Sequence, residues 1–384
     1  MVFFENTLCV NCGHLLAFLP SLLIVGSLDP AGEAQTTWTS PLPAAAGRTY
    51  HLCANYRGGQ VCNWAVDDAD DHPLCVSCRL TQIIPDLSVE GYQAAWYRLE
   101  VAKRRLLYTL LKLGLPFDDG SPAHPPLVFR FLSDFVSDGT EALTGHADGV
   151  ITVNVAEAYD AERERRRHML GEPYRTILGH MRHEVGHYYW TRLIAADKAR
   201  LERFRQLFGD DRQDYAEALK RHYETGPPAD WQDRFVTAYA SAHAWEDWAE
   251  TWAHYLHMSD TMETAAACGL SLRPSRRGEP ALSKVPSSAV TPSGSFDRLI
   301  NGWHAVTYML NSLNRGMGLA DAYPFVLAPA AIEKLRFVHE MLGEENRPEQ
   351  RTGDDATVEP SNRQPGLLRE ARPTRTRTVE PSNP

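Results

Sequence analysis

Two histidines four residues apart constrain this chain more than any other feature, because a glutamate directly follows the first of them. Residues 183–187 read H-E-V-G-H. In a helix, positions i and i+4 lie one turn apart on the same face, so both imidazoles can reach one metal ion. The flanking sequence predicts such a helix, since Pro173 suits a first turn and residues 174–194 contain no proline. Gly186 is a poor helix former, which indicates that another element packs closely against this turn.

A catalytic zinc site needs a third protein ligand and one position left open for water. The segment 244–257 is rich in aromatic residues yet carries three carboxylates, Glu246, Asp247 and Glu250. Glu246 and Glu250 share a helix face, and buried carboxylates are costly unless they are paired or bind metal. We assign Glu246 as the third ligand and Glu250 as the acceptor of a hydrogen bond from the far nitrogen of either histidine. Two alternatives stay open: Glu250 as the ligand, and a solvated acidic helix face, above all for Asp247.

The pattern H-E-x-x-H on a helix is typical of zinc metallopeptidases. His183 and His187 would hold the catalytic zinc, and Glu184 would act as the general base for a zinc-activated water that attacks a peptide bond. The oxyanion formed in this step needs a hydrogen-bond donor besides the metal. Resemblance to zincins with an acid-rich ligand helix, which often place a tyrosine at this position, implies Tyr239 for this role, with His243 as the alternative donor. Simple packing is the competing interpretation of Tyr239.

Cysteine usage predicts a second metal centre. Six of the seven cysteines precede residue 79, and residues 9–12 and 75–78 both read C-x-x-C. Because a C-x-x-C turn presents two thiolates to one ion, two such pairs in a short region indicate zinc. We prefer one structural zinc held by Cys53, Cys62, Cys75 and Cys78. Cys9 and Cys12 would then form a separate partial site; pairing of these two with the 75–78 pair, and disulfides, are the alternatives.

The remaining sequence predicts an α+β fold that is mainly helical, with a small sheet. Strands are expected at 127–131 and 150–155, the second of which is rich in β-branched residues. Helices are expected at 94–113, within 174–194 (the histidine-bearing helix), near 200–223, at 231–258 (the glutamate-bearing helix), at 296–313 and at 329–342. We divide the chain into a loop-rich module held together by zinc (1–85), a main domain (86–342) and a disordered tail (343–384).

Several motifs resemble a bacterial family of zinc-binding metallopeptidases that carry an N-terminal zinc ribbon. The resemblance spans roughly residues 3–270 and is carried by segments 144–154, 172–176, 182–190 and 245–252. Within the zinc peptidases it is similar to the gluzincin branch, in which a glutamate ligand is followed by a second acid four residues later. The resemblance implies a zincin-like peptidase domain, a peptide or protein substrate, one catalytic zinc and one structural zinc.

Two further expectations rest on this resemblance. In zincins, a strand with an exposed edge lies over the zinc helix and aligns an extended substrate, so we expect residues 149–155 to do this; an internal strand is the alternative. Family members also commonly carry another C-x-x-C pair ahead of the segment that matches residues 3–7. The chain starts at that segment, so we expect Cys9 and Cys12 to be half of a truncated knuckle.

Charge and hydropathy limit the function classes. The apolar run 15–28 is too short to span a bilayer and contains Pro20. The residues before it include Glu5 but no lysine or arginine, which is the wrong charge for a signal peptide. Together with the need for reduced cysteines, this predicts a cytoplasmic protein without membrane association. A formal net charge of −10 argues against general nucleic-acid binding. The sequence does not indicate the oligomeric state.

Two hypotheses of different classes follow. The first is a cytoplasmic zinc metallopeptidase whose zinc ribbon recruits or positions the substrate. The second is a zinc-ribbon adaptor or binding protein whose zincin domain is weakly active or inactive. The sequence favours the first hypothesis, because degenerate peptidases commonly lose the general base and Glu184 is present.

Overall fold

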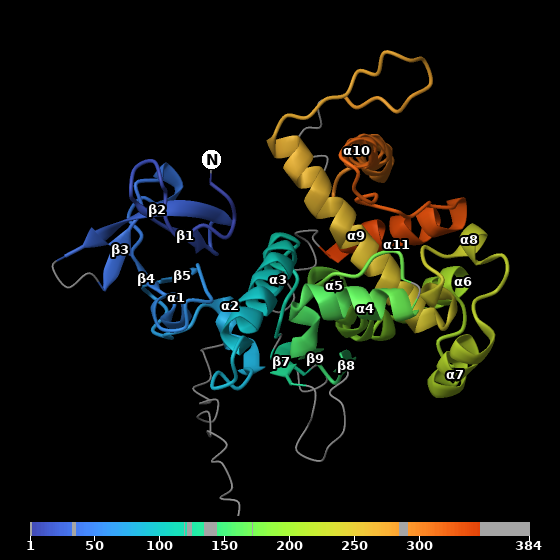
Figure 1. Ribbon diagram of the computed structural model, residues 1–384, viewed down its shortest axis with the longest axis horizontal. Coiled ribbons are helices and arrows are strands. Elements are labelled where there is room, and N and C mark those ends of the chain that lie inside the picture. The colour runs from blue at the N-terminus through green and yellow to red at the C-terminus, as the bar shows by residue number, and fades with distance from the viewer. Residues whose placement is uncertain are drawn as a thin grey trace, which may run out of the picture. The chain divides into compact units, whose positions relative to one another are not determined.

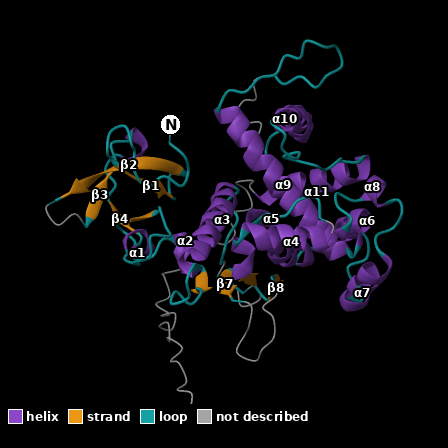
Figure 2. Ribbon diagram, in the orientation of Figure 1, coloured by secondary structure: helices purple, strands orange, loops and turns teal. Residues whose placement is uncertain are grey.

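The computed structural model describes residues 2–32, 36–118, 120, 125–133, 144–170, 172–283 and 291–345. Within these residues the protein is α+β, as the sequence predicted, with strands at the N-terminus and mostly helices after residue 90 (Figure 2). Of the tail predicted to be disordered (343–384), residues 346–384 lie outside the described part, and residues 343–345 are helical. None of the helices described is both long enough and apolar enough to cross a membrane.

The N-terminal region is built on an antiparallel sheet with the strand order β1-β2-β3-β4-β5. The strands are β1 (Leu15–Leu19), β2 (Ile24–Ala31), β3 (Thr37–Thr39), β4 (Tyr50–Leu52) and β5 (Ala65–Asp67). The apolar run 15–28 forms the β1–β2 hairpin, in which Ala17, Leu19 and Leu28 are buried. The sequence alone does not predict this sheet, because the run reads as one apolar segment until the turn at 20–23 reverses the chain.

A second sheet has the strand order β6-β7-β9-β8. Its strands are β6 (Thr81–Ile83), β7 (Val128–Leu132), β8 (Gly145–Ala147) and β9 (Val150–Asn154). The first three in this order are parallel, and β8 pairs antiparallel with β9 through a two-residue turn. Asp148 and Gly149 in this turn have positive φ angles of 47° and 79°, as a type I′ hairpin requires. Since β9 lies between β7 and β8, the expectation that residues 149–155 form an exposed edge is wrong; among the described strands, β6 and β8 are the edges of this sheet.

The longer helices are α3 (Tyr92–Lys112), α4 (Asp160–Leu170), α5 (Ile177–Tyr189), α6 (Lys198–Phe208), α7 (Tyr215–Thr225), α9 (Ala244–Ala267), α10 (Phe296–Gly316) and α11 (Pro329–Glu345). Short helical turns occur at α1 (Ala54–Arg57), α2 (Val76–Arg79), α8 (Trp231–Arg234), Pro43–Ala45, Val155–Ala158, Trp190–Ala195 and Tyr239–Ser241. The helix predicted at 231–258 is broken after α8. It restarts only beyond His243, whose ring accepts a hydrogen bond from the Trp245 amide and so caps α9.

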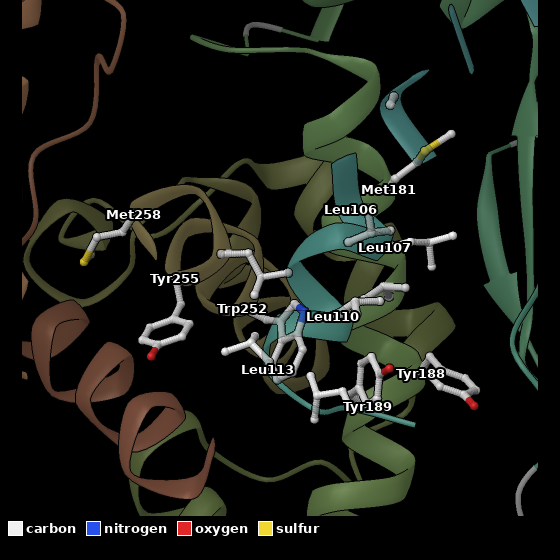
Figure 3. Packing of buried hydrophobic residues seen from close by; sticks show 14 of the residues in the cluster. Leu106, Leu107, Leu110, Leu113, Met181, Tyr188, Tyr189, Trp252, Tyr255 and Met258 are labelled. Carbon is white, nitrogen blue, oxygen red and sulfur yellow. The ribbon is translucent and has the colours of Figure 1, made fainter. Parts of the chain in front are cut away.

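The core that positions the candidate site forms where α5 packs against both α3 and α9 (Figure 1). All three helices contribute buried apolar side chains, among them Leu106, Leu110, Tyr189, Trp252 and Tyr255 (Figure 3). The rings of Tyr189 and Trp252 stack with their centroids 5.2 Å apart. The histidine-bearing helix is therefore held on two sides by tightly packed side chains.

Gly186 permits the close approach of α5 to α9. A Cβ atom added at this glycine would lie 3.0 Å from the Cα of Ala249 and 3.3 Å from the Cβ of Trp252. The Gly186 carbonyl also accepts a hydrogen bond from Nε1 of Trp248 (2.8 Å). Close packing against this turn, which the sequence predicted, is confirmed.

Substitution of Gly186 by valine is expected to destabilise the protein by about 1–3 kcal/mol, the usual cost of added methyl groups in a packed interface. The added atoms would meet the backbone of α9, which cannot move aside as a flexible side chain could. Urea denaturation of Gly186→Val should therefore show a lower midpoint. The matched change Ala267→Val, at an exposed position of α9, should cost less than ~1 kcal/mol. Equal midpoints for the two variants would contradict this account.

Candidate metal centres

Two histidines of α5 and one glutamate of α9 converge on a common point. His183 and His187 lie on successive turns of α5, and Glu246 lies in the first turn of α9. Their potential ligand atoms all lie within 4.8 Å of one another. The close contact at Gly186 brings the two helices near enough for this convergence.

The arrangement of these atoms fits a metal ion. Oε2 of Glu246 lies 3.0 Å from Nε2 of His183, yet it is buried and accepts no hydrogen bond from the described residues. Oε1 of Glu246 lies 3.6 Å from Nε2 of His187. Two imidazoles and a carboxylate are a common ligand set for catalytic zinc. A divalent cation between them would satisfy the buried carboxylate, which otherwise carries a high desolvation cost.

Glu250 lies one helical turn after Glu246 and contacts the far nitrogen of His183. Its Oε1 accepts a hydrogen bond from Nδ1 of His183 (2.7 Å), and its Oε2 accepts one from Oγ1 of Thr237 (2.8 Å). Burial acts to raise the pKa of Glu250, but the hydrogen bonds from His183 and Thr237, together with the charges of the nearby histidines, outweigh it, so the pKa lies below its usual value. The ionised carboxylate keeps the imidazole proton on Nδ1, which leaves Nε2 available for a metal. This geometry favours Glu246 over Glu250 as the ligand.

Glu184 follows His183 on α5 and lines a cavity of about 680 Å³ that His183 and Tyr239 also line. Burial raises the pKa of Glu184 above its usual value. A carboxylate with a raised pKa can both accept and return a proton near neutral pH. The position and the pKa of Glu184 therefore suit a general base.

The two residues considered as oxyanion donors have different surroundings. The ring of Tyr239 lies 6.0 Å from that of His183, and Tyr239 lines the cavity. Burial raises the pKa of Tyr239 well above its usual value, so the hydroxyl keeps its proton. His243, in contrast, accepts a hydrogen bond at Nδ1 from the Trp245 amide (3.1 Å) and donates from Nε2 to the Gln213 carbonyl (3.2 Å). Both nitrogens of His243 are thus engaged within the protein, which favours Tyr239 as the candidate donor.

Two side chains that no sequence motif indicated as site residues, Tyr215 and His146, also contact this site. The hydroxyl of Tyr215, on α7, donates a hydrogen bond to Oε1 of Glu246 (2.6 Å). The ring of His146, on β8, stacks with that of His187 at 6.3 Å, and burial lowers the pKa of His146 to about 4. The Asp-Gly turn signal would have identified the hairpin that carries His146. The local sequence around Tyr215 contains no comparable signal.

Asp247 does not lie on a solvated helix face, which was the alternative interpretation of this acidic segment. It is fully buried, and its Oδ2 accepts a hydrogen bond from Nζ of Lys334 on α11 (2.6 Å). Lys334 also donates to the carbonyl of Arg234 (2.9 Å). Burial raises the pKa of Asp247 to about 7 despite the nearby lysine. Asp247 therefore joins α9 to α11 and takes no part in the converging group.

Four cysteines form a second cluster, in the N-terminal region. Cys53, Cys62, Cys75 and Cys78 are all buried, and their sulfur atoms lie within 4.8 Å of one another. Sγ of Cys62 lies 3.7 Å from Sγ of Cys75. This separation is far longer than a disulfide bond of about 2.05 Å. It is close to the roughly 3.8 Å edge of a tetrahedron whose zinc–sulfur bonds are about 2.3 Å. The four thiols therefore fit one tetrahedral zinc ion.

Short helices and backbone amides present these thiols. Cys53 immediately precedes α1, and Cys75 immediately precedes α2. The amide of Cys75 donates to Sγ of Cys53 (3.3 Å), and the amide of Trp64 donates to Sγ of Cys62 (3.4 Å). Cys9 and Cys12 are more exposed and belong to neither cluster of the described residues. The set preferred from the sequence is thus the one that converges.

Comparison with known proteins matches two consecutive parts of the chain. Residues 92–341 match the family described as "Putative zinc-binding metallo-peptidase", and residues 1–89 match a zinc-ribbon domain. Uncharacterized proteins from Mycobacterium bovis and Mycobacterium tuberculosis are 45% identical over 343 residues, which is 89% of this chain and 92% of each relative. No solved structure gives a significant match. The chain therefore belongs to this zinc-binding metallo-peptidase family and carries a zinc-ribbon domain at its N-terminus.

Proposed function

We propose that this protein is a zinc-dependent peptidase that uses Glu184 as its general base. The observation that carries the proposal is the convergence of His183, His187 and Glu246 beside a cavity that Glu184 lines. Three protein ligands leave a fourth position for water and substrate, which is the arrangement that a catalytic zinc needs. Membership in the zinc-binding metallo-peptidase family supports the same class of reaction.

In the proposed mechanism, zinc held by the three ligands would lower the pKa of a water molecule and polarise the carbonyl of the peptide bond. Glu184 accepts a proton from the water and later delivers it to the departing amine. The raised pKa of Glu184, which burial causes, suits both proton transfers. Glu250 keeps the proton of His183 on Nδ1 and so orients this imidazole.

Tyr239 is proposed as the hydrogen-bond donor to the oxyanion that forms when the carbonyl is attacked. It lines the same cavity as Glu184, and its raised pKa supports a protonated hydroxyl. Tyr215 is not proposed for this role, because its hydroxyl already donates to Glu246. We propose instead that Tyr215 positions the glutamate ligand.

Tyr239→Phe is expected to lower kcat by about 10²–10³-fold with little change in KM, the usual effect of removing one oxyanion donor. The zinc content should not change, because the hydroxyl is not a ligand. Initial rates of peptide cleavage and metal analysis of the same sample measure both quantities. Tyr308→Phe, which removes an exposed hydroxyl of α10, is the matched control. An unchanged kcat for Tyr239→Phe would leave only the packing role for this ring.

An extended substrate backbone is proposed to pair with β8. This strand ends the order of the described strands and packs against α5. Thr144, which immediately precedes it, lines the cavity. Free backbone groups at the edge of a sheet can hydrogen-bond an added strand, which would hold a peptide along the site. We thus propose for β8 the role that was expected of residues 149–155.

The four clustered cysteines are proposed to hold a structural zinc that stabilises the zinc-ribbon domain, and this domain is proposed to position the substrate. Thiolates that bind zinc need reducing conditions, which supports the expected cytoplasmic location. The zinc-ribbon match covers residues 1–89 and includes the whole cluster. The total expected is one catalytic and one structural zinc per chain.

Metal analysis combined with peptide cleavage tests the proposed function. The zinc-loaded protein should cleave members of an unbiased peptide library, lose this activity on chelation and regain it when zinc is restored. The alternative is an adaptor protein whose peptidase domain is inactive. Such a protein would bind zinc at both clusters and cleave no peptide, and this result would overturn the proposal.

A further inference from the structure

The cavity beside Glu184 continues away from the candidate metal site along a groove between α5 and α9. His254 and His257 lie one and two turns after Glu250 on the same face of α9, and both line the cavity. Tyr174, which precedes α5, and Phe325, which precedes α11, line it as well. The cavity, of about 680 Å³, is thus bounded at one end by catalytic side chains and at the other by four rings.

These four rings form a continuous wall. Ring centroids are 4.5 Å apart for His254 and Phe325, 5.7 Å apart for Tyr174 and His257, and 6.2 Å apart for Tyr174 and Phe325. Behind the wall, Nδ1 of His254 shares a hydrogen bond with the hydroxyl of Tyr323 (2.7 Å). The rings are therefore held in place before any ligand binds.

The charged side chains that line this part of the cavity are already paired. Arg175 forms ion pairs with Glu157 (2.6 Å) and Glu172 (2.8 Å), and Arg182 forms an ion pair with Asp260. A charged substrate group entering here would lose its water and compete with an existing pair, which is costly. A neutral ring would lose no such interaction.

The two histidines of the wall are uncharged at neutral pH. Burial lowers the pKa of His254 to about 4 and the pKa of His257 to about 3. Two apolar side chains at the cavity mouth, Met169 and Tyr223, are each 66% exposed although they are large. Neutral rings in the interior and exposed apolar groups at the entrance favour an apolar, aromatic ligand.

Resting on the proposed peptidase function, we propose that Tyr174, His254, His257 and Phe325 form a specificity subsite for an aromatic side chain next to the bond that is cleaved. We refer to these four residues as the aromatic subsite. Ala253, on α9 between Glu250 and the aromatic subsite, lines the cavity with a small side chain that leaves space for the incoming ring. The substrate class is therefore peptides or proteins with phenylalanine, tyrosine or tryptophan beside the scissile bond.

Binding to an inactive protein tests the aromatic subsite without relying on catalysis. The probes are end-blocked peptides that are identical except for one central residue, which is Phe, Asp or Lys. Titration calorimetry with the zinc-loaded Glu184→Gln protein should show at least tenfold tighter binding of the Phe peptide. Adding Ala253→Leu, which narrows the groove, should abolish this preference and leave the zinc content unchanged. Adding Ala267→Leu instead, at an exposed position of the same helix, should change neither the preference for the Phe peptide nor the zinc content.

A second variant tests the aromatic subsite independently, in case Ala253→Leu fails to fold. Phe325→Ala removes one half-buried ring of the wall and should weaken binding of the Phe peptide several-fold, while binding of the Asp peptide stays the same. Thermal melting shows whether each variant is folded. Equal affinity for all three peptides, or a Phe preference that persists in both folded variants, would overturn the aromatic subsite.

Cleavage by the wild-type protein separates this inference from the proposed function. Cleavage sites in an unbiased peptide library should be enriched in aromatic residues on one side of the bond. Tight binding of the Phe peptide without any cleavage would support the aromatic subsite and overturn the peptidase function. Cleavage without any aromatic preference would support the peptidase function and overturn the aromatic subsite.

Discussion

Glu184→Gln is expected to lower kcat/KM for peptide cleavage by about 10²–10⁴-fold, the range that a positioned general base contributes. Glutamine keeps the size and polarity of the side chain but cannot accept the proton of the attacking water. Burial raises the pKa of Glu184, which helps the carboxylate to accept and release a proton near neutral pH. The glutamine amide cannot exchange a proton in this way. The effect should appear in kcat, because the carboxylate is needed for the reaction more than for substrate binding.

The zinc content of Glu184→Gln should match that of the wild type, since the converging atoms belong to His183, His187 and Glu246. Parallel metal analysis and initial rates on one preparation measure the two effects together. Glu202→Gln, an exposed change on α6, is the matched control and should leave both values unchanged. Equal cleavage by Glu184→Gln and the wild type would remove the proposed chemistry.

Cys62→Ser is expected to remove one zinc ion per chain and to destabilise the zinc-ribbon domain by several kcal/mol. The apparent free energy with which structural zinc binds to small zinc domains is about 10 kcal/mol or more. Loss of one thiolate ligand should remove a large part of this stabilisation. All four cysteines also belong to the hydrophobic core cluster that contains Trp64 and Trp96. Loosening of the thiol cluster should therefore expose aromatic side chains as well.

Metal analysis and thermal melting followed by tryptophan fluorescence check this expectation. Cys268→Ser, an exposed cysteine near the end of α9, is the matched control and should keep both zinc ions and the wild-type melting temperature. The catalytic site of Cys62→Ser should still bind its zinc, because its ligands lie on α5 and α9. If Cys62→Ser kept the full zinc content, the four cysteines would not be a zinc site.

Local patterns predicted those parts of the candidate site that lie within one helix or one turn. The spacing of His183 and His187 predicts a shared helix face, and both lie on α5. The same holds for the strands at 128–132 and 150–154, whose aromatic residues in the first and β-branched residues in the second favour extended backbone. In each case the prediction depends on neighbours within a few residues, whose geometry the backbone itself determines.

Pairing between distant segments was less accessible from the sequence. The position of β9 inside the sheet depends on β7 and β8 together, so its own composition could not distinguish an edge from an interior strand. Tyr215 is 31 residues from Glu246 along the chain, and only the fold brings its hydroxyl to the carboxylate. Lys334, the partner of Asp247, is even farther away, at 87 residues along the chain, so the sequence left a solvated Asp247 as an alternative.

The amino-acid sequence by itself determined that two imidazoles share one helix face and that thiols occur in pairs able to hold an ion, because helical and turn geometry are local properties. Only the tertiary structure decided that Glu246 meets those imidazoles while Glu250 contacts the far nitrogen of His183. Both glutamates lie on α9, one turn apart, so their different positions follow from how α9 packs on α5. That packing depends on the contact at Gly186 and on aromatic side chains from distant parts of the chain, which no local pattern encodes.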